Sequence, residues 1–170
     1  MGNTSTRVCD SPTSRRLLSP VVSRGDELTS SAAAHAHGTP STPSRLHADA
    51  LWRLGYRGSG VHVAVFDTGL GDSQPLLPNV AERVNWTDED DVDDRVGHGT
   101  FVASVIGAAS SAAGSACRGL APDATLHVFK VFNSKQLSYT SWFLDAFDYV
   151  LAKGTIHILN LSIGGMLHAG

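Results

Sequence analysis

Two residues that can move a proton together, an aspartate and a histidine, stand at the ends of predicted elements. Asp67 follows a short apolar run at 61–66, and Gly69 then permits a sharp turn. His98 stands between two glycines at the start of an apolar, helix-like segment. At a helix start the macrodipole favours the neutral imidazole that a general base needs. The pattern predicts that the carboxylate holds one ring nitrogen while the other faces a nucleophile.

Taken singly, each of these residues also has a purely structural interpretation. Strands often end in an aspartate that serves a turn or a helix cap. A histidine at a helix start can be a cap or a structural ligand. The combination of Asp67 with His98 is more informative than either residue, because each completes the other's chemistry.

A run of acidic residues precedes His98. Residues 88–94 contain six of the 16 acidic residues in the chain. The run could bind Ca²⁺, which prefers several hard oxygen ligands, or it could attract basic residues of a substrate. We favour a loop with solvated carboxylates, so no metal ligand and no cofactor is assigned, and Ca²⁺ stays an alternative.

Six segments have the periodicity of regular structure and must position these side chains. Helical spacing or apolar β-rich runs predict helices at 46–54, 100–109 and 141–152, and strands at 61–66, 125–132 and 156–163. Residues 68–97 are interpreted mainly as loop. The alternation predicts an α/β fold, an open, mostly parallel sheet with helices on both faces. Sites in such sheets form outside the carboxyl ends of the strands, which is where Asp67 stands.

The composition divides the chain and excludes several classes of protein. Residues 1–50 contain no Phe, Trp or Tyr, so we separate a low-complexity segment, 1–45, from a folding unit, 46–170. A net charge of −3 argues against a nucleic-acid partner. No apolar run approaches the roughly 18 residues of a membrane span. Cys9 and Cys117 lack metal-binding spacing and are expected to be unpaired thiols.

Three motifs resemble signature blocks of the subtilisin-like serine proteases, in the order and register of that family. They are VFDTG at 65–69, GHGTFVA at 97–103 and NLSIGG at 160–165. Phe101 and the segment SYTSWFLDA at 138–146 look most like the site-1 protease branch. The resemblance covers roughly residues 50–165 and implies a subtilisin-like fold and a serine-type endopeptidase acting on peptide or protein substrates.

The resemblance also implies a role for individual residues. Asp67 would be the triad acid that orients His98, and His98 the general base that takes the serine proton and returns it to the leaving amine. Ser162, Ile163 and Gly164 resemble the edge strand that pairs with the substrate backbone. The branch acts in the Golgi on membrane-bound transcription-factor precursors, which implies a location in the secretory pathway or Golgi membrane. The sequence itself gives no compartment.

The low-complexity segment contains RRLL at 15–18, which resembles the sequence that site-1 protease cleaves, including in its own propeptide. We expect residues 1–18 to be the end of a prosegment that is cut after Leu18, so the protein's own prosegment would be a partner. An arginine-containing linker is the alternative.

The family's nucleophilic serine and oxyanion-hole asparagine have no counterpart within the 170 residues. We therefore expect an incomplete, N-terminal part of a subtilase catalytic domain, whose triad serine lies beyond this chain. The isolated chain is expected to be poorly stable and to hydrolyse no peptide bond. The alternative is a non-catalytic, truncated α/β module that binds a peptide or the parent protease.

Overall fold

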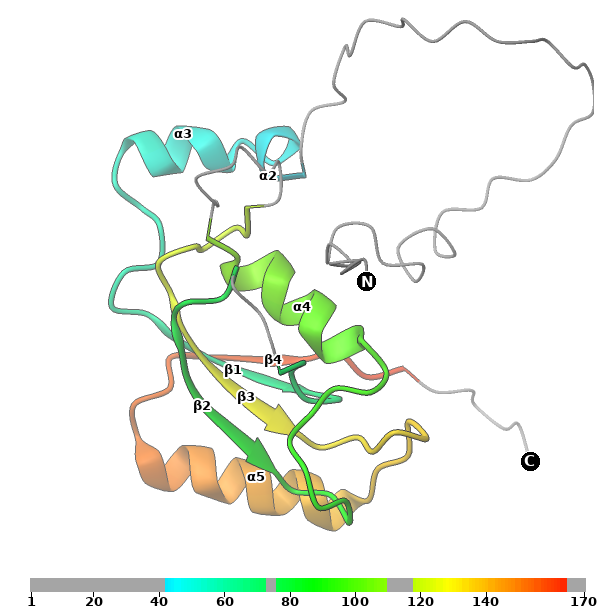
Figure 1. Cartoon of the computed structure of the whole chain (residues 1–170). Coiled ribbons are helices and arrows are strands. Elements are labelled where there is room, and N and C mark those ends of the chain that lie inside the picture. Colours follow the sequence, from blue (N-terminus) through cyan, green and yellow to red (C-terminus); the bar gives the residue numbers. More distant parts are fainter. Residues whose placement is uncertain (1–41, 73–75, 110–117, 165–170) are drawn as a thin grey trace, which may run out of the picture.

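A four-stranded, wholly parallel sheet forms the centre of the structure (Figure 1). The computed structural model describes residues 42–72, 76–109 and 118–164. The strands are β1 (His62–Asp67), β2 (Val80–Asn85), β3 (Thr125–Lys130) and β4 (Ile158–Leu161), and they lie in the order β2-β3-β1-β4. Every neighbouring pair is parallel, which confirms the predicted α/β fold.

Two helices cover opposite faces of the sheet, α4 (His98–Gly107) on one side and α5 (Thr140–Lys153) on the other (Figure 1). Alternate residues of each central strand enter a different apolar core. The α4 side takes Val63, Val65, Ala103, Leu126 and Val128, and the α5 side takes Ala64, Phe66, Phe129, Ala146 and Val150. Burial on both faces explains why the central strands are near-continuous apolar runs.

Outside β2 the described residues of 68–97 form no helix or strand, so the prediction of mainly loop holds for them, but it missed the strand β2. It pairs with β3 from Val80 to Asn85. This strand is at the edge of the sheet, mixes polar and apolar residues, and has no fully buried residue. It therefore lacks the continuous apolar run that identifies β1 and β3 in the sequence.

Several element boundaries differ from those predicted. The helix predicted at 46–54 is the shorter α3 (Ala48–Arg53), because His47 before it has a left-handed backbone, φ 58°. A further short helix, α2 (Thr42–Arg45), precedes it and was not predicted. The strand predicted at 156–163 is confined to β4, Ile158–Leu161. Helix α4 includes His98 as its first residue.

Some predictions lie outside the described residues: the pairing state of Cys9 and Cys117 and the cleavage site after Leu18. The division of the chain at residue 45 stays a prediction. Across 42–72, 76–109 and 118–164, no helix is long and apolar enough to cross a membrane.

Candidate active site

Asp67 and His98 are in direct contact at the carboxyl end of β1. The His98 Nδ1 atom lies 2.8 Å from Asp67 Oδ1 and 3.0 Å from Oδ2. The carboxylate is 1% exposed, whereas the imidazole is 43% exposed. Because an ionised carboxylate only accepts hydrogen bonds, Nδ1 must carry the proton. In the neutral ring Nε2 is then the acceptor, as a general base requires.

Glycines bring the start of α4 close enough to β1 for this contact. Gly97 precedes the helix with a left-handed backbone, φ 92°. A Cβ atom on Gly99 would lie only 2.3 Å from the carbonyl oxygen of Gly69, so no other residue fits there unless the backbone moves. The amide of Gly99 donates to Thr68 Oγ1 at 2.9 Å. Steric constraints thus explain why both residues next to His98 are glycines, and the sequence pattern alone does not reveal these constraints.

Asp94 joins the first turn of α4 to the end of β1. Its Oδ1 accepts hydrogen bonds from Thr68 Oγ1 at 2.8 Å, from the Gly97 amide at 2.7 Å and from the Val96 amide at 3.0 Å. Its Oδ2 accepts from the amide and hydroxyl of Thr100 at 2.8 and 2.7 Å. A helix start leaves amides without intrahelical partners. Asp94 and Thr68 together supply those partners on both sides of His98.

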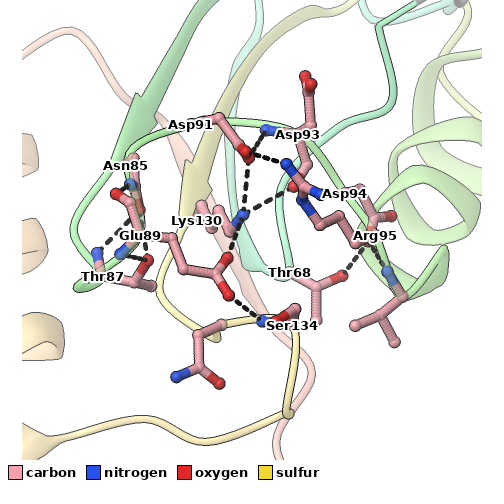
Figure 2. Close-up of polar contacts among 12 residues, drawn as sticks. Thr68, Asn85, Thr87, Glu89, Asp91, Asp93, Asp94, Arg95, Lys130 and Ser134 are labelled. Carbon is pink, nitrogen blue, oxygen red and sulfur yellow. Dashed lines mark hydrogen bonds and ion pairs between the residues drawn. The ribbon is translucent and has the colours of Figure 1, made fainter.

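A buried lysine holds the acidic loop, residues 88–94, against the sheet (Figure 2). Lys130, at the end of β3, is 1% exposed. Its Nζ lies 2.7 Å from Glu89 Oε2 and 3.3 Å from Asp91 Oδ1, and it donates to the carbonyl oxygen of Asp93 at 2.7 Å. Arg83 of β2 pairs with Asp93 Oδ1 at 2.7 Å from the other side.

These contacts favour the ionised carboxylates. The Lys130 ammonium, helped by the Ser134 amide, lowers the pKa of Glu89 from 4.5 to about 2. Arg95 and, to a smaller extent, Lys130 lower the pKa of Asp91 from 3.8 to about 2. The prediction of a loop with solvated carboxylates is therefore wrong for Glu89 and Asp91, which pair with Lys130 and Arg95. Within the described ranges, no group of three or more His, Cys, Asp or Glu side chains could hold a metal ion.

The third predicted group, Ser162 to Gly164, lies beyond the carboxyl end of β4. Because Leu161 pairs with Phe66, this segment leaves the sheet at the same edge as Asp67. Ser162 is half buried, and its Oγ donates to Asn160 Oδ1 at 3.1 Å. Ile163 is 55% exposed and follows the strand instead of belonging to it. In the part of the chain described, these residues share an edge with the Asp67–His98 pair without bonding to it.

Sequence reasoning missed Lys130 and Asp94 as residues that shape the site, although both leave a signal. A lone lysine in the apolar run 125–132 must find counter-charges if the strand is buried on both faces. An aspartate just before a helix start is a common partner for its free amides.

Comparison with known proteins agrees with this geometry. The subtilase family model matches residues 58–168. The chain is 58% identical over 120 residues to the membrane-bound transcription factor site-1 protease of Homo sapiens, which covers 71% of this chain and 11% of that protein. It is 48% identical over 122 residues to a subtilisin-like protease of Arabidopsis thaliana, covering 72% of this chain and 11% of that protein.

A bacterial relative extends the comparison. Subtilisin E of Bacillus subtilis is 33% identical over 133 residues, covering 77% of this chain and 34% of that protein. The chain thus spans about a tenth of the length of the site-1 proteases that it matches. Because the family model matches well over half of its residues, the chain belongs to the subtilase family.

Proposed function

We propose that these residues belong to a serine endopeptidase in which Asp67 and His98 are the acid and base of an Asp-His-Ser triad. The serine would lie beyond residue 170. The observation that carries the proposal is the 2.8 Å contact between the Nδ1 atom of the accessible His98 and the buried carboxylate of Asp67. Membership of a family of serine proteases supports the same roles.

In this mechanism the buried carboxylate fixes the tautomer and orientation of the imidazole. With its proton on Nδ1, His98 can accept the serine hydroxyl proton at Nε2 as the oxygen attacks the scissile carbonyl. Asp67 then stabilises the imidazolium and stays ionised. His98 returns the proton to the leaving amine, so the two residues act as a unit with the nucleophile.

The segment from Ser162 to Gly164 is proposed to bind the substrate backbone. It follows the edge strand β4 and its Ile163 and Gly164 are exposed, so a peptide could add to the sheet there by β-augmentation. From the name of the site-1 proteases we further propose that the substrates are membrane-bound transcription factors. The location that we propose with them is the secretory pathway or Golgi membrane. Detection of the tagged protein elsewhere would contradict that location.

The prosegment proposal has a direct test. A peptide spanning residues 11–22 should be cut after Leu18 by the active protein, and replacement of Arg15 by Ala should slow the cut. A peptide left intact, or cut elsewhere, would leave residues 1–18 as a linker.

A polypeptide of only these 170 residues is proposed to be inactive, because it contains no Gly-Thr-Ser block that could supply the nucleophile. A serine-directed phosphonate should label the protein translated from the complete transcript but leave the 170-residue polypeptide unlabelled. His98→Ala should abolish labelling of the complete protein, whereas replacement of the exposed Asp145 by Asn should not. Specific labelling of the 170-residue polypeptide would overturn the proposal.

Sequencing of that transcript separates the two functions considered. An in-frame block with an asparagine and a Gly-Thr-Ser motif after the Gly170 codon supports the endopeptidase. A stop codon there, together with a stably folded product that binds peptides, would support the non-catalytic module instead.

A further inference from the structure

Lys130 and Asp94 connect strand β3 to the helix that begins with His98. We propose that the two are positioning residues for the Asp67–His98 pair and act through the acidic loop. The inference rests on the proposed function in calling that pair catalytic. Its structural part is that Lys130 restrains the first turn of α4 without contacting it. This part can be tested without any catalytic activity.

The first step is the anchoring of the loop by Lys130. Its ammonium is buried and contacts Glu89 and Asp91, so removal of the charge would leave the partly buried Glu89 without its cationic partner and Asp91 with Arg95 alone. The lysine lies at the carboxyl end of β3, and the backbone of this strand is held by hydrogen bonds to β1 and β2 on both sides. The loop is thereby attached to a strand that is paired on both sides (Figure 2).

The second step carries this constraint to Asp94. Lys130 Nζ donates to the carbonyl oxygen of Asp93, at 2.7 Å. That carbonyl belongs to the peptide group that joins Asp93 to Asp94. Because a peptide group is planar and stiff, a hold on its oxygen also limits the position of the Asp94 backbone. Arg83 holds the Asp93 side chain as well, so loss of Lys130 should loosen this unit without releasing it.

The third step is the placement of His98. The Asp94 carboxylate bonds to Thr68, which is adjacent to the triad acid, and to Gly97 and Thr100, which flank the triad base. One side chain therefore fixes both halves of the pair relative to each other. Neither Lys130 nor Asp94 forms a hydrogen bond with the Asp67 or His98 side chain among the described residues, so neither is a catalytic residue.

The test uses the protein translated from the complete transcript, because the isolated 170-residue chain is expected to be poorly stable, and it has two readouts from nuclear magnetic resonance. One is the signal of the His98 Nδ1 proton, which the hydrogen bond to Asp67 should deshield. The other is hydrogen exchange of the Gly97 and Thr100 amides, compared with the amide of Val65, which reports global unfolding.

Asp94→Asn should speed exchange of the Gly97 or the Thr100 amide by at least about tenfold relative to Val65, since one acceptor oxygen is lost. It should also broaden or shift the His98 Nδ1 proton. The matched control is Asp90→Asn, which removes a charge from an exposed position in the same loop and should leave both readouts unchanged.

Lys130→Gln should speed exchange of the same amides by a smaller factor, although Lys130 touches neither of them. Replacement of the exposed Lys135 by Gln is its control. In the Asp94→Asn background, Lys130→Gln should have no further effect on these amides, because its influence passes through Asp94. Additive effects, or unchanged readouts in Lys130→Gln, would overturn the proposal.

A milder variant covers the case in which Asp94→Asn does not fold. Thr68→Val removes the hydroxyl that links Asp94 with the Gly99 amide and that also donates to Asp67 Oδ1 at 3.3 Å. It should speed Gly99 exchange about tenfold and shift the His98 signal, and an unaltered signal would count against the inference. If the exchange results hold while a complete protein with Asp67→Asn stays fully active, the proposed function fails and the positioning stands.

Discussion

Lys130 and Asp67 occupy paired positions on the adjacent strands β3 and β1, are equally buried at 1% exposure, and bond to different partners. The lysine contacts the acidic loop, and the aspartate bonds to His98 and to the Thr68 amide. These two oppositely charged side chains therefore do not pair with each other, and each pairs with other groups. Because the loop supplies the counter-charges of Lys130, the Asp67 carboxylate is available to the histidine.

Asp67→Asn should lower kcat of the complete protein by roughly 10⁴-fold, with KM little changed, because the amide stabilises the wrong imidazole tautomer. Cleavage of a peptide substrate measures both constants. The Asp145→Asn protein is the reference. A loss of less than about tenfold would exclude Asp67 from the triad.

Glu89→Gln should destabilise the fold near neutral pH. It should also make the free energy of unfolding depend less on pH in the acid range. The folded state holds the pKa of Glu89 at about 2 instead of 4.5, chiefly through Lys130. The ionised carboxylate therefore contributes its stabilisation fully above pH 4.5, and this is lost as the pH falls toward about 2. Urea unfolding across that range should show the wild type and variant converging in acid.

The exposed Asp90 gives the control for that experiment. Asp90→Asn should follow the wild-type curve throughout the acid range. A Glu89→Gln curve that runs parallel to the wild type at every pH would show that the lysine does not favour the charged carboxylate.

Tyr149→Phe should lower the free energy of unfolding by about 1–2 kcal/mol, because its hydroxyl donates to Glu82 Oε2 at 2.9 Å. Burial raises the pKa of Glu82, but hydrogen bonds from Lys153, His127 and Tyr149 outweigh it, so the pKa is lowered. Tyr139→Phe is the matched control, since that ring is 60% exposed. If both variants lost the same free energy of unfolding, the hydrogen bond to Glu82 would not be the cause of the loss in Tyr149→Phe.

Gly99→Ala should cost about 1–3 kcal/mol of stability through overpacking and displace the imidazole from Asp67. The added methyl group would otherwise lie 2.3 Å from the Gly69 carbonyl oxygen. Thermal unfolding and the His98 Nδ1 proton signal measure the two effects. Gly164→Ala meets no atom within 4 Å and should be neutral for stability.

The sequence was most informative where apolar residues form a continuous run or recur at helical spacing. Strands β1 and β3 and helix α5 were predicted because their apolar residues recur without interruption or at helical spacing. Strand β2 was missed because an edge strand with residues such as Glu82 and Arg83 does not need that pattern. Asp67 and His98 could be paired in advance because each has a definite chemistry.

The supporting contacts could not be predicted in the same way. Which carboxylates of the acidic loop meet Lys130 depends on how the loop folds back over β3, and six similar side chains offer no local signal for the choice. Likewise, α3 begins after His47 because this residue has a left-handed backbone, which residues other than glycine seldom adopt.

The strand order determines when the Asp67–His98 pair can form during synthesis of the protein. Asp67 and His98 both emerge from the ribosome before β3, yet β3 lies between β1 and β2 and carries the lysine that secures the loop before His98. A nascent chain that ends before Lys130 therefore contains both residues without the support that aligns them. Non-local pairing of this kind also slows folding, so the pair is expected to form late, after the third strand has been inserted.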